Sequence, residues 1–248
     1  MSGSVQRYDN IGSGYAQRRR ADPRIMAQID AALGPAASVI NVGAGAGAYE
    51  PAGRRVLAVE PSQVMISQRR SVAPAVRAVA EALPVPDGFF DAALATFTVH
   101  HWSDPARGLA EMRRVAGCQV VLTFDQDDEW LDAFWLTRDY LPQEHFRGRM
   151  FTGLEEVLAG LAPARVEVVP VPGDCVDGFF CAYWKRPSAY LDPDVRASIS
   201  ALALLDPQIL RPGLERLASD LASGVWEERN NDLLTLDSCD FGYRLVVS

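Results

Sequence analysis

Three glycines at alternate positions follow a short apolar run near the start of the chain. The run at 38–42 predicts a buried strand, and Gly43 permits a tight turn after it. Because Gly45 lacks a Cβ, a ligand can approach the backbone there. A helix that begins at Gly47 would add free N–H groups and a positive dipole end. The chemistry expected here is the binding of a nucleotide-type ligand, although glycine-rich turns also occur as plain structure.

Acidic and hydroxyl side chains follow further strand-like runs. Glu60 closes the run at 55–60, about where dinucleotide-binding folds place the acid that holds the ribose. A carboxylate there can accept hydrogen bonds from both ribose hydroxyls, whereas the plainer interpretation is a surface glutamate at a strand end. Glu81 and Thr96 follow the third and fourth runs.

The segment His100-His101-Trp102 adds titratable side chains to the same part of the chain. An imidazole titrates near neutral pH and can remove a proton from a substrate. His101 is our first candidate for a general base, and His100 is the second. Both histidines could instead only shape a pocket or bind backbone groups. Further candidate bases lie later in the chain at Asp125, His145 and Asp177.

These residues need a scaffold that brings them together. Apolar runs predict five strands in the first half of the chain, at 38–42, 55–60, 75–79, 89–95 and 119–124. Helical patterns separate several of them, which implies right-handed crossovers and a parallel sheet with helices on both faces. Such sheets bind ligands at the carboxyl ends of their strands. The residues that fall there are Gly43, Gly45, Glu60, Glu81 and Thr96.

The second half of the chain predicts a cap over this edge. A sixth strand is expected at 166–169 and a seventh at 243–247, and a long, largely helical excursion lets the last strand insert antiparallel. The expected fold is α/β, a Rossmann-like, doubly wound seven-stranded sheet with a mostly helical cap. Aromatic residues of the cap would line a substrate pocket together with Trp102, or would pack as an ordinary core. They are Trp130, Trp135, Phe179, Phe180 and Trp184.

We divide the chain into four parts. They are an N-terminal flap and helix (1–37), a cofactor-binding α/β core (38–125), a cap segment with a helix (126–164), and the last two strands (165–248) with a helical cap insertion at 172–240. The flap carries two tyrosines and an arginine cluster before the glycine turn. It would close over the ligand, with an arginine pairing a ligand carboxylate, or else form a solvated arm.

Composition and charge exclude several classes of function. The chain has 248 residues, 48% hydrophobic and 23% charged, as expected for an ordinary globular protein. The formal net charge of −8 argues against nucleic acid as a partner, because phosphate backbones need a basic face. The four cysteines form no CxxC pair and no histidine lies at zinc-ligand spacing, so no metal is expected. Without a signal peptide or a long uncharged apolar run, we expect a cytoplasmic protein with no membrane partner.

Together these motifs resemble the class I S-adenosylmethionine-dependent methyltransferases, in the small-molecule group related to ubiquinone-biosynthesis methyltransferases. The resemblance is carried by segments 39–47, 56–62, 80–91 and 100–102, and it extends over residues 8–124 and more loosely over the final strand. It implies a seven-stranded sheet whose last strand is antiparallel. It also implies S-adenosylmethionine as the cofactor, S-adenosylhomocysteine as the product and a small-molecule acceptor.

The resemblance further implies a role for individual residues. The methionine part of the cofactor would contact Gly43, Ala44, Gly45, Thr96 and Phe97. The ribose and adenine would contact Glu60, Pro61, Met65, Ala80, Glu81 and Ala82. The cofactor carboxylate would be covered by Arg19 or Arg20 with Tyr8 or Tyr15. The methyl group would lie near His100 and His101, at the floor of the pocket.

Asn41 departs from the family pattern, which has an acid at this place that commonly serves the amino group of the cofactor. An amide oxygen can still accept a hydrogen bond, so the departure concerns affinity or orientation. No Asn-Pro-Pro-type signature of amino-group methylation of nucleic acid or protein is visible. The aromatic residues favour an apolar or aromatic acceptor, and they leave oxygen, nitrogen and carbon open as the methylated atom.

Two other functions fit parts of the sequence. A nicotinamide-dependent oxidoreductase would also use a G-x-G-x-x-A turn, which residues 43–48 satisfy. The long N-terminal flap, the acid after the third strand and the absence of a Tyr-x-x-x-Lys pair argue against it. The same fold could instead serve as a cyclase, a pericyclase or a binding module, with or without the cofactor.

Overall fold

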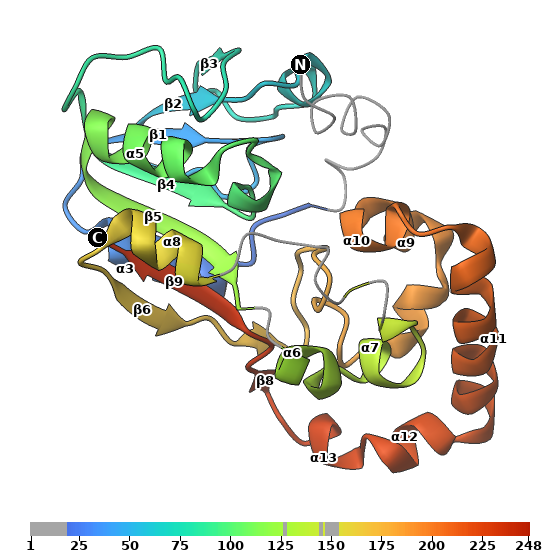
Figure 1. The fold of residues 1–248 in the computed structure, drawn as a ribbon. Coiled ribbons are helices and arrows are strands. Elements are labelled where there is room, and N and C mark those ends of the chain that lie inside the picture. Colours follow the sequence, from blue (N-terminus) through green and yellow to red (C-terminus); the bar gives the residue numbers. More distant parts are fainter. Residues whose placement is uncertain (1–18, 126–127, 144–145, 147–153) are drawn as a thin grey trace.

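A seven-stranded sheet forms the centre of the computed structural model, which describes residues 19–125, 128–143, 146 and 154–248. The strands lie in the order β3-β2-β1-β4-β5-β9-β6 (Figure 1). Their bounds are β1 Ser38–Val42, β2 Arg55–Val59, β3 Ala75–Val76, β4 Phe90–Thr96, β5 Ala116–Phe124, β6 Arg165–Val168 and β9 Tyr243–Val247. Every residue of β1 is buried, as expected for a central strand that is covered on both faces.

Strand directions confirm the predicted fold class. β1 pairs in parallel with β2 and with β4, and the outer neighbours β3 and β5 keep this direction. β9 runs antiparallel to β5 on one side and to β6 on the other. The chain winds outward from β1 to β3 and then returns to β4 on the other side of β1. Parallel sheets bind ligands in the crevice outside such a switch point.

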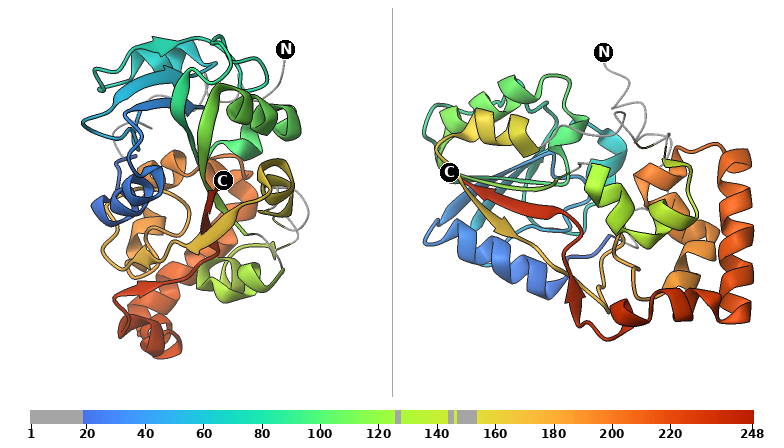
Figure 2. Two further views of the ribbon diagram at one scale, coloured as in Figure 1. Left: turned by 90° about the vertical axis from the view of Figure 1, so that its left-hand side faces the viewer. Right: turned by 60° about the horizontal axis from the view of Figure 1, so that its bottom comes forward.

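Helices cover both faces of the sheet. α3 (Pro23–Leu33) packs against β5 on one face, and α5 (Pro105–Val115) and α8 (Leu154–Leu161) pack side by side on the other. The left view of Figure 2 shows α3 and the α5–α8 pair on opposite sides of the sheet. Asp22 caps α3 by accepting a hydrogen bond from the backbone N–H of Arg24 at 3.0 Å, which fixes where this helix begins.

The prediction that a helix begins at Gly47 is wrong. Residues 43–54, all of which are described, form successive turns between β1 and β2. Four glycines in this stretch have positive φ angles, between 52° and 85°. An α-helix needs φ near about −60°, so the chain cannot continue into one here. No helix dipole therefore stands behind this turn.

The third and fifth strands differ in length from their prediction. β3 ends at Val76 instead of residue 79, because the chain then leaves the sheet to form one wall of the cavity described below. β5 begins at Ala116, earlier than the predicted residue 119, directly after α5. A short helix, α4 (Gln63–Ser67), follows β2.

Helices from the second half of the chain, most of them short, form a cap beside the carboxyl edge of the sheet (Figure 1). Their bounds are α6 Asp128–Ala133, α7 Trp135–Asp139, η3 Pro187–Leu191, α9 Pro193–Ser198, α10 Ser200–Ala203, α11 Pro207–Ser223, α12 Val225–Arg229 and α13 Asn231–Leu234. β7 (Val171–Pro172) and β8 (Ser238–Cys239) pair as a small antiparallel ribbon at the base of the cap. Of the helices in the described parts of the chain, none has both the length and the apolar character needed to span a bilayer.

An aromatic core holds the cap together. The indole N–H of Trp135 donates to the carbonyl oxygen of Trp184 at 2.9 Å. Its ring meets the rings of Trp226 and Tyr190 edge-on, with centroid separations of 5.2 and 5.6 Å. Such edge-to-face pairs are a favoured arrangement of buried aromatic rings.

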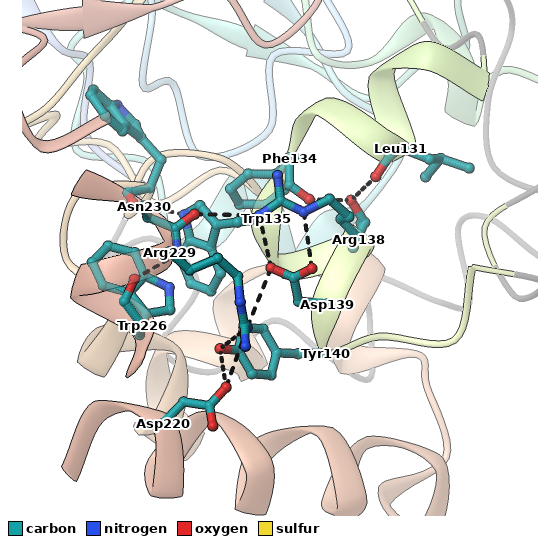
Figure 3. A network of polar contacts seen from close by, with 12 residues as sticks. Leu131, Phe134, Trp135, Arg138, Asp139, Tyr140, Asp220, Trp226, Arg229 and Asn230 are labelled. Carbon is teal, nitrogen blue, oxygen red and sulfur yellow. Dashed lines mark hydrogen bonds and ion pairs between the residues drawn. The ribbon is translucent and has the colours of Figure 1, made fainter. Parts of the chain in front are cut away.

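A polar network on the cap joins α7 to α11 and α12 (Figure 3). Arg138 donates to both carboxylate oxygens of Asp139, at 2.9 and 2.8 Å. The Tyr140 hydroxyl donates to Asp220 at 2.8 Å, and Arg229 donates to the same Asp220 oxygen at 3.3 Å. The network thus links α7 to α11 and α12, two consecutive helices that follow it about 70 residues later in the chain.

Candidate functional site

The glycine loop, residues 43–47, folds back onto the end of β2. The backbone N–H groups of Gly43 and Ala44 both donate to the carbonyl oxygen of Val59, at 2.8 and 3.0 Å. The backbone N–H of Gly45 donates instead to the Glu60 carboxylate at 2.8 Å. These bonds hold the loop beside β2, so the carboxyl ends of β1 and β2 form one surface.

Glu60 connects the glycine loop to α4. One carboxylate oxygen accepts from Gly45, and the other accepts from the backbone N–H of Ser62 at 2.9 Å. The Ser62 hydroxyl in turn caps α4 by accepting from the Met65 N–H at 3.2 Å. Since each carboxylate oxygen has more than one lone pair, Glu60 can brace the loop and still accept a hydrogen bond from a ligand.

The chain is strained where it leaves β4. Phe97 has a φ of 53° and is the one non-glycine residue with positive φ in the described ranges. Conformations of this kind cost about 1–3 kcal/mol and concentrate at functional sites. The bend places Thr98 against the glycine loop, so a Cβ added at Gly43 would lie 2.0 Å from the Thr98 hydroxyl oxygen. The contact between the two strand ends therefore requires glycine at position 43.

A cavity of about 660 Å³ opens where these strand ends meet. This volume falls in the range of about 300–1,000 Å³ that is usual for ligand sites. Among the described residues, those that line it come from the segment 19–103: Arg19, Gly43, Ala44, Gly45, Ala46, Ala48, Tyr49, Glu60, Pro61, Ser62, Met65, Arg77, Ala78, Val79, Ala80, Glu81, Thr96, Phe97, Thr98, His101, Trp102 and Ser103. The cavity thus occupies the carboxyl ends of β1, β2 and β4, where the sequence predicts a ligand.

Glu81 fixes the segment 103–104, which lies at one wall of the cavity. One of its carboxylate oxygens accepts hydrogen bonds from the backbone N–H and the hydroxyl of Ser103, both at 2.7 Å, and from the Asp104 N–H at 3.0 Å. Burial alone would raise the pKa of Glu81, but these hydrogen bonds outweigh it and lower the pKa. Glu81 is therefore an ionised carboxylate that braces the chain before α5.

The two histidines lie in the 3₁₀-helix η1 (Val99–His101) and have different surroundings. His101 lines the cavity, whereas His100 does not. The His100 ring packs on the rings of His101 and Phe124, at centroid separations of 3.7 and 5.1 Å. Burial holds the pKa of His100 well below its usual range, and the nearby charges of His101 and Arg19 act in the same direction. His100 thus packs beside His101 with a lowered pKa, and His101 is the histidine of the two that lines the cavity.

Arg19 supplies a cation to the cavity wall. Its Nε donates to Asp177 at 2.8 Å, and its guanidinium carbon lies 5.6 Å from the centre of the Phe97 ring. Arg20 is exposed and lies outside the lining of the cavity. Tyr8 and Tyr15, which we predict to accompany these arginines, lie outside the described residues.

Asn41 lies beside a buried ion pair under the glycine loop. Arg69 and Glu50 are joined by an N–O contact of 2.6 Å, and their side chains are only 4% and 6% exposed. The Asn41 amide nitrogen donates to the same Glu50 oxygen at 3.4 Å. A carboxylate at position 41 would face the Glu50 carboxylate with one arginine to share, which explains the amide at this position.

Most of the predicted cofactor contacts line the cavity, and Ala82 does not. Eleven of them line the cavity: Arg19, Gly43, Ala44, Gly45, Glu60, Pro61, Met65, Ala80, Glu81, Thr96 and Phe97. Ala82 is absent from the lining, because the turn after residue 79 directs it outward to solvent. Of the predicted bases outside the cavity, Asp177 contacts Arg19, and His145 lies outside the described residues.

Most of the aromatic residues predicted to line a substrate pocket do not line this cavity. Trp102 does, but the other five belong to the cap and its base: Trp130, Trp135, Phe179, Phe180 and Trp184. Trp135 and Trp184 are fully buried, and the Trp130 and Phe180 rings pack at 5.9 Å. Together with buried aliphatic side chains of the cap such as Leu202 and Leu217, these rings form the core that holds the cap helices together.

Several lining residues escape the sequence analysis. Tyr49 follows the glycine loop by two positions, and its aromatic type so close to a predicted turn is the signal that could have identified it. The sequence predicts that the third strand extends to residue 79, whereas residues 77–79 line the cavity. An apolar run does not show where the chain leaves a sheet. Thr98 carries no local signal, since its role depends on contact with Gly43.

Comparison with known proteins identifies relatives of this chain. A family model described as a methyltransferase domain matches residues 40–119. A crystal structure from Anabaena variabilis, described as a methyltransferase from an antibiotic biosynthesis pathway, is 30% identical with a TM-score of 0.79, covering 94% of this chain and 99% of that chain. A S-adenosylmethionine-dependent methyltransferase of Thermotoga maritima, 22% identical with a TM-score of 0.51 over 69% of this chain and 86% of that one, is alike in fold. A comparison with curated proteins finds no match.

Proposed function

Since the chain belongs to the class I S-adenosylmethionine-dependent methyltransferase family, of the small-molecule type, we propose that it transfers a methyl group from S-adenosylmethionine to an apolar or aromatic small molecule. The observation that carries this proposal is the cavity at the carboxyl ends of β1, β2 and β4. This single cavity is lined by the glycine loop, by the Glu60 carboxylate at the end of β2, by apolar side chains and by the Arg19 guanidinium.

The lining of the cavity fits the parts of this cofactor. The backbone of the glycine loop can approach the methionine part closely, because no Cβ intervenes. Glu60 can accept from the ribose hydroxyls, and Met65 and Val79 offer apolar surface to the adenine ring. Arg19 can pair with the carboxylate. Further proposed contacts are Ala44, Pro61, Ala80, Glu81, Thr96 and Phe97.

His101 is the residue that we propose as general base. When bound, S-adenosylmethionine would supply an electrophilic methyl group. The bond between the methyl carbon and the sulfur would break as the bond to the acceptor forms, which leaves S-adenosylhomocysteine. The protein must align the acceptor with that bond and exclude water. Where the acceptor is a hydroxyl or a carbon acid, the imidazole of His101 at the cavity wall can take its proton. Trp102 provides a flat apolar surface beside it.

A role in the biosynthesis of a small metabolite agrees with the relative from Anabaena variabilis. That protein is described as part of an antibiotic biosynthesis pathway, and it aligns over nearly its whole length. The proposed acceptor class also agrees with the aromatic side chains, Phe97 and Trp102, that line the cavity.

The test follows the methyl group with purified protein. S-adenosylmethionine labelled in its methyl group is supplied with a panel of aromatic hydroxyl, amine and carbon-acid acceptors, and S-adenosylhomocysteine and labelled product are quantified. Glu60→Gln should weaken S-adenosylmethionine binding by about tenfold or more, as expected for hydrogen bonds to a charged group. Glu129→Gln, at an exposed position of α6, should leave it unchanged. Binding without S-adenosylhomocysteine formation across the panel would contradict methyl transfer and favour a cyclase or binding role.

A further inference from the structure

Asp177, in the loop after β7, holds two cavity-lining side chains that come from distant segments. Its side chain is completely buried, and its carboxylate accepts from Nε of Arg19 at 2.8 Å and from the hydroxyl of Tyr49 at 2.9 Å. Nη2 of Arg19 adds a second bond at 3.3 Å. The backbone N–H groups of Arg20 and Gly178 donate to the same carboxylate at 3.2 and 2.7 Å. Five hydrogen bonds thus converge on a group that does not itself line the cavity.

The contacts to Asp177 orient Arg19 and Tyr49. A two-point contact between a guanidinium and a carboxylate fixes the plane of the guanidinium, which a single contact does not. Burial, followed by the charge of Asp177, raises the pKa of Tyr49 well above its usual value, so its hydroxyl stays a donor. The Arg19 side chain is only 12% exposed and also packs on the Phe97 ring. A side chain ordered in advance loses less conformational entropy when a ligand binds.

Other contacts join the same two segments away from the cavity. Asp22 accepts from the Val176 N–H at 3.1 Å, and Arg24 pairs with Asp174 at 2.6 Å. The Arg24–Asp174 pair is exposed, with 49% and 83% of the two side chains accessible. Because these contacts do not involve Asp177, the two segments remain joined when its charge is removed.

We propose that Asp177 is a positioning residue for the anion-binding side of the cavity, setting Arg19 and Tyr49 for the carboxylate of the bound cofactor. The proposal rests on the proposed function, and it gives the insertion 172–240 a part in cofactor binding. The insertion, which the structure describes in full, contributes no lining residue of its own. The insertion therefore acts through Arg19 and Tyr49.

A double-mutant cycle tests this role, with S-adenosylhomocysteine as the probe in calorimetric titrations. Asp177→Asn should weaken binding by about tenfold, and Arg19→Met by at least as much, as expected for a charged hydrogen-bonded contact. The loss of binding in the double variant should be smaller than the sum of the two single losses, because Asp177 acts in part through Arg19. Asp174→Asn is the matched control in the same loop and should bind as the wild type does. Unchanged binding by Asp177→Asn, or additive losses in the cycle, would overturn the proposal.

A second variant tests the proposal if Asp177→Asn does not fold. Arg19→Lys keeps the positive charge but cannot form the two-point contact, so it should also weaken S-adenosylhomocysteine binding by about tenfold. Wild-type affinity in folded Arg19→Lys would overturn the role of a fixed guanidinium. Failure of the wild-type protein to bind would contradict the proposed function instead, so the two failures can be told apart.

Discussion

A buried ion pair decides which side chain fits at position 41. Glu50 and Arg69 already form a charge-balanced pair under the glycine loop, and Asn41 adds a hydrogen bond to it without adding charge. A buried charge is tolerated only where it is paired and hydrogen-bonded. The acid that the family usually has at this place would leave the cluster with a net negative charge.

Asn41→Asp should therefore destabilise the fold in a pH-dependent way. At pH 7 we expect the free energy of unfolding to fall by about 1–3 kcal/mol, because a second buried carboxylate faces Glu50. In the folded variant the nearby Glu50 carboxylate should raise the pKa of the new carboxyl at position 41, so the folded state binds the extra proton and the loss shrinks as the pH falls. Urea denaturation at pH 7 and pH 5 measures the difference. An equal loss at both pH values would contradict this account of Asn41.

Alanine substitutions at Gly43 and Gly53 distinguish the cost of a steric clash from the cost of a strained backbone. Both have positive φ, but an added Cβ at Gly43 would lie 2.0 Å from Thr98, whereas at Gly53 it would meet nothing within 4 Å. Gly53→Ala should cost about 1–2 kcal/mol for the strained backbone alone. Gly43→Ala should cost more, and it should also weaken S-adenosylmethionine binding. Denaturation and calorimetry on the pair check this, and equal effects of the two substitutions would show that contact with Thr98 is unimportant.

His100 should make stability depend on pH below neutrality. Its pKa in the folded protein lies well below the usual value, so the unfolded state takes up the proton first. The stability contributed by its neutral form is complete above about pH 6.5, the ordinary histidine pKa, and is lost as the pH falls toward the folded value. His100→Gln removes this titration. Urea denaturation at pH 8 and pH 5.5 should show a smaller acid loss in the variant than in the wild type, and identical losses would argue against a lowered pKa of His100 in the folded protein.

The elements of the cap depend on aromatic packing. Trp135 lies in α7, yet it contacts Trp184 near the base of the cap and Trp226 in α12. Its substitution should thus loosen several elements at once. The cap is held by these side chains and by the polar network of Figure 3.

Trp135→Ala should lower the free energy of unfolding by about 3–5 kcal/mol, the usual cost of removing a large buried side chain. Trp135→Phe keeps an aromatic ring and should cost less, while Val72→Ala, at an exposed position, should have an effect near zero. Denaturant titration measures all three. Folded Trp135→Phe should bind S-adenosylmethionine as the wild type does, and weaker binding would place Trp135 in the site after all.

The strands could be predicted from the sequence, whereas the surroundings of individual side chains could not. Short apolar runs and the order in which they alternate with helices are local signals, and they identify the sheet and its direction. A cap tryptophan such as Trp135 has the same local signal in a core as in a pocket. The pairing of Glu50 with Arg69, and of Asp177 with Arg19, joins residues too distant in sequence for any spacing rule to connect.

In the whole molecule, the two halves of the chain have different structural roles. The segment 19–103 supplies the lining of the cavity, and the second half completes the sheet and packs as a cap beside it. The right-hand view of Figure 2 shows the cap at one end of the sheet. Contacts such as Arg19–Asp177 connect the halves.

Calorimetric titration of the full chain with S-adenosylmethionine decides whether the cavity is a cofactor site. We expect saturable heat with one site per chain, and no heat with NADH under the same conditions. We also expect that Glu60→Gln weakens the binding by about tenfold or more. Absence of S-adenosylmethionine binding by the folded protein, or binding of NADH in its place, would contradict the proposed function.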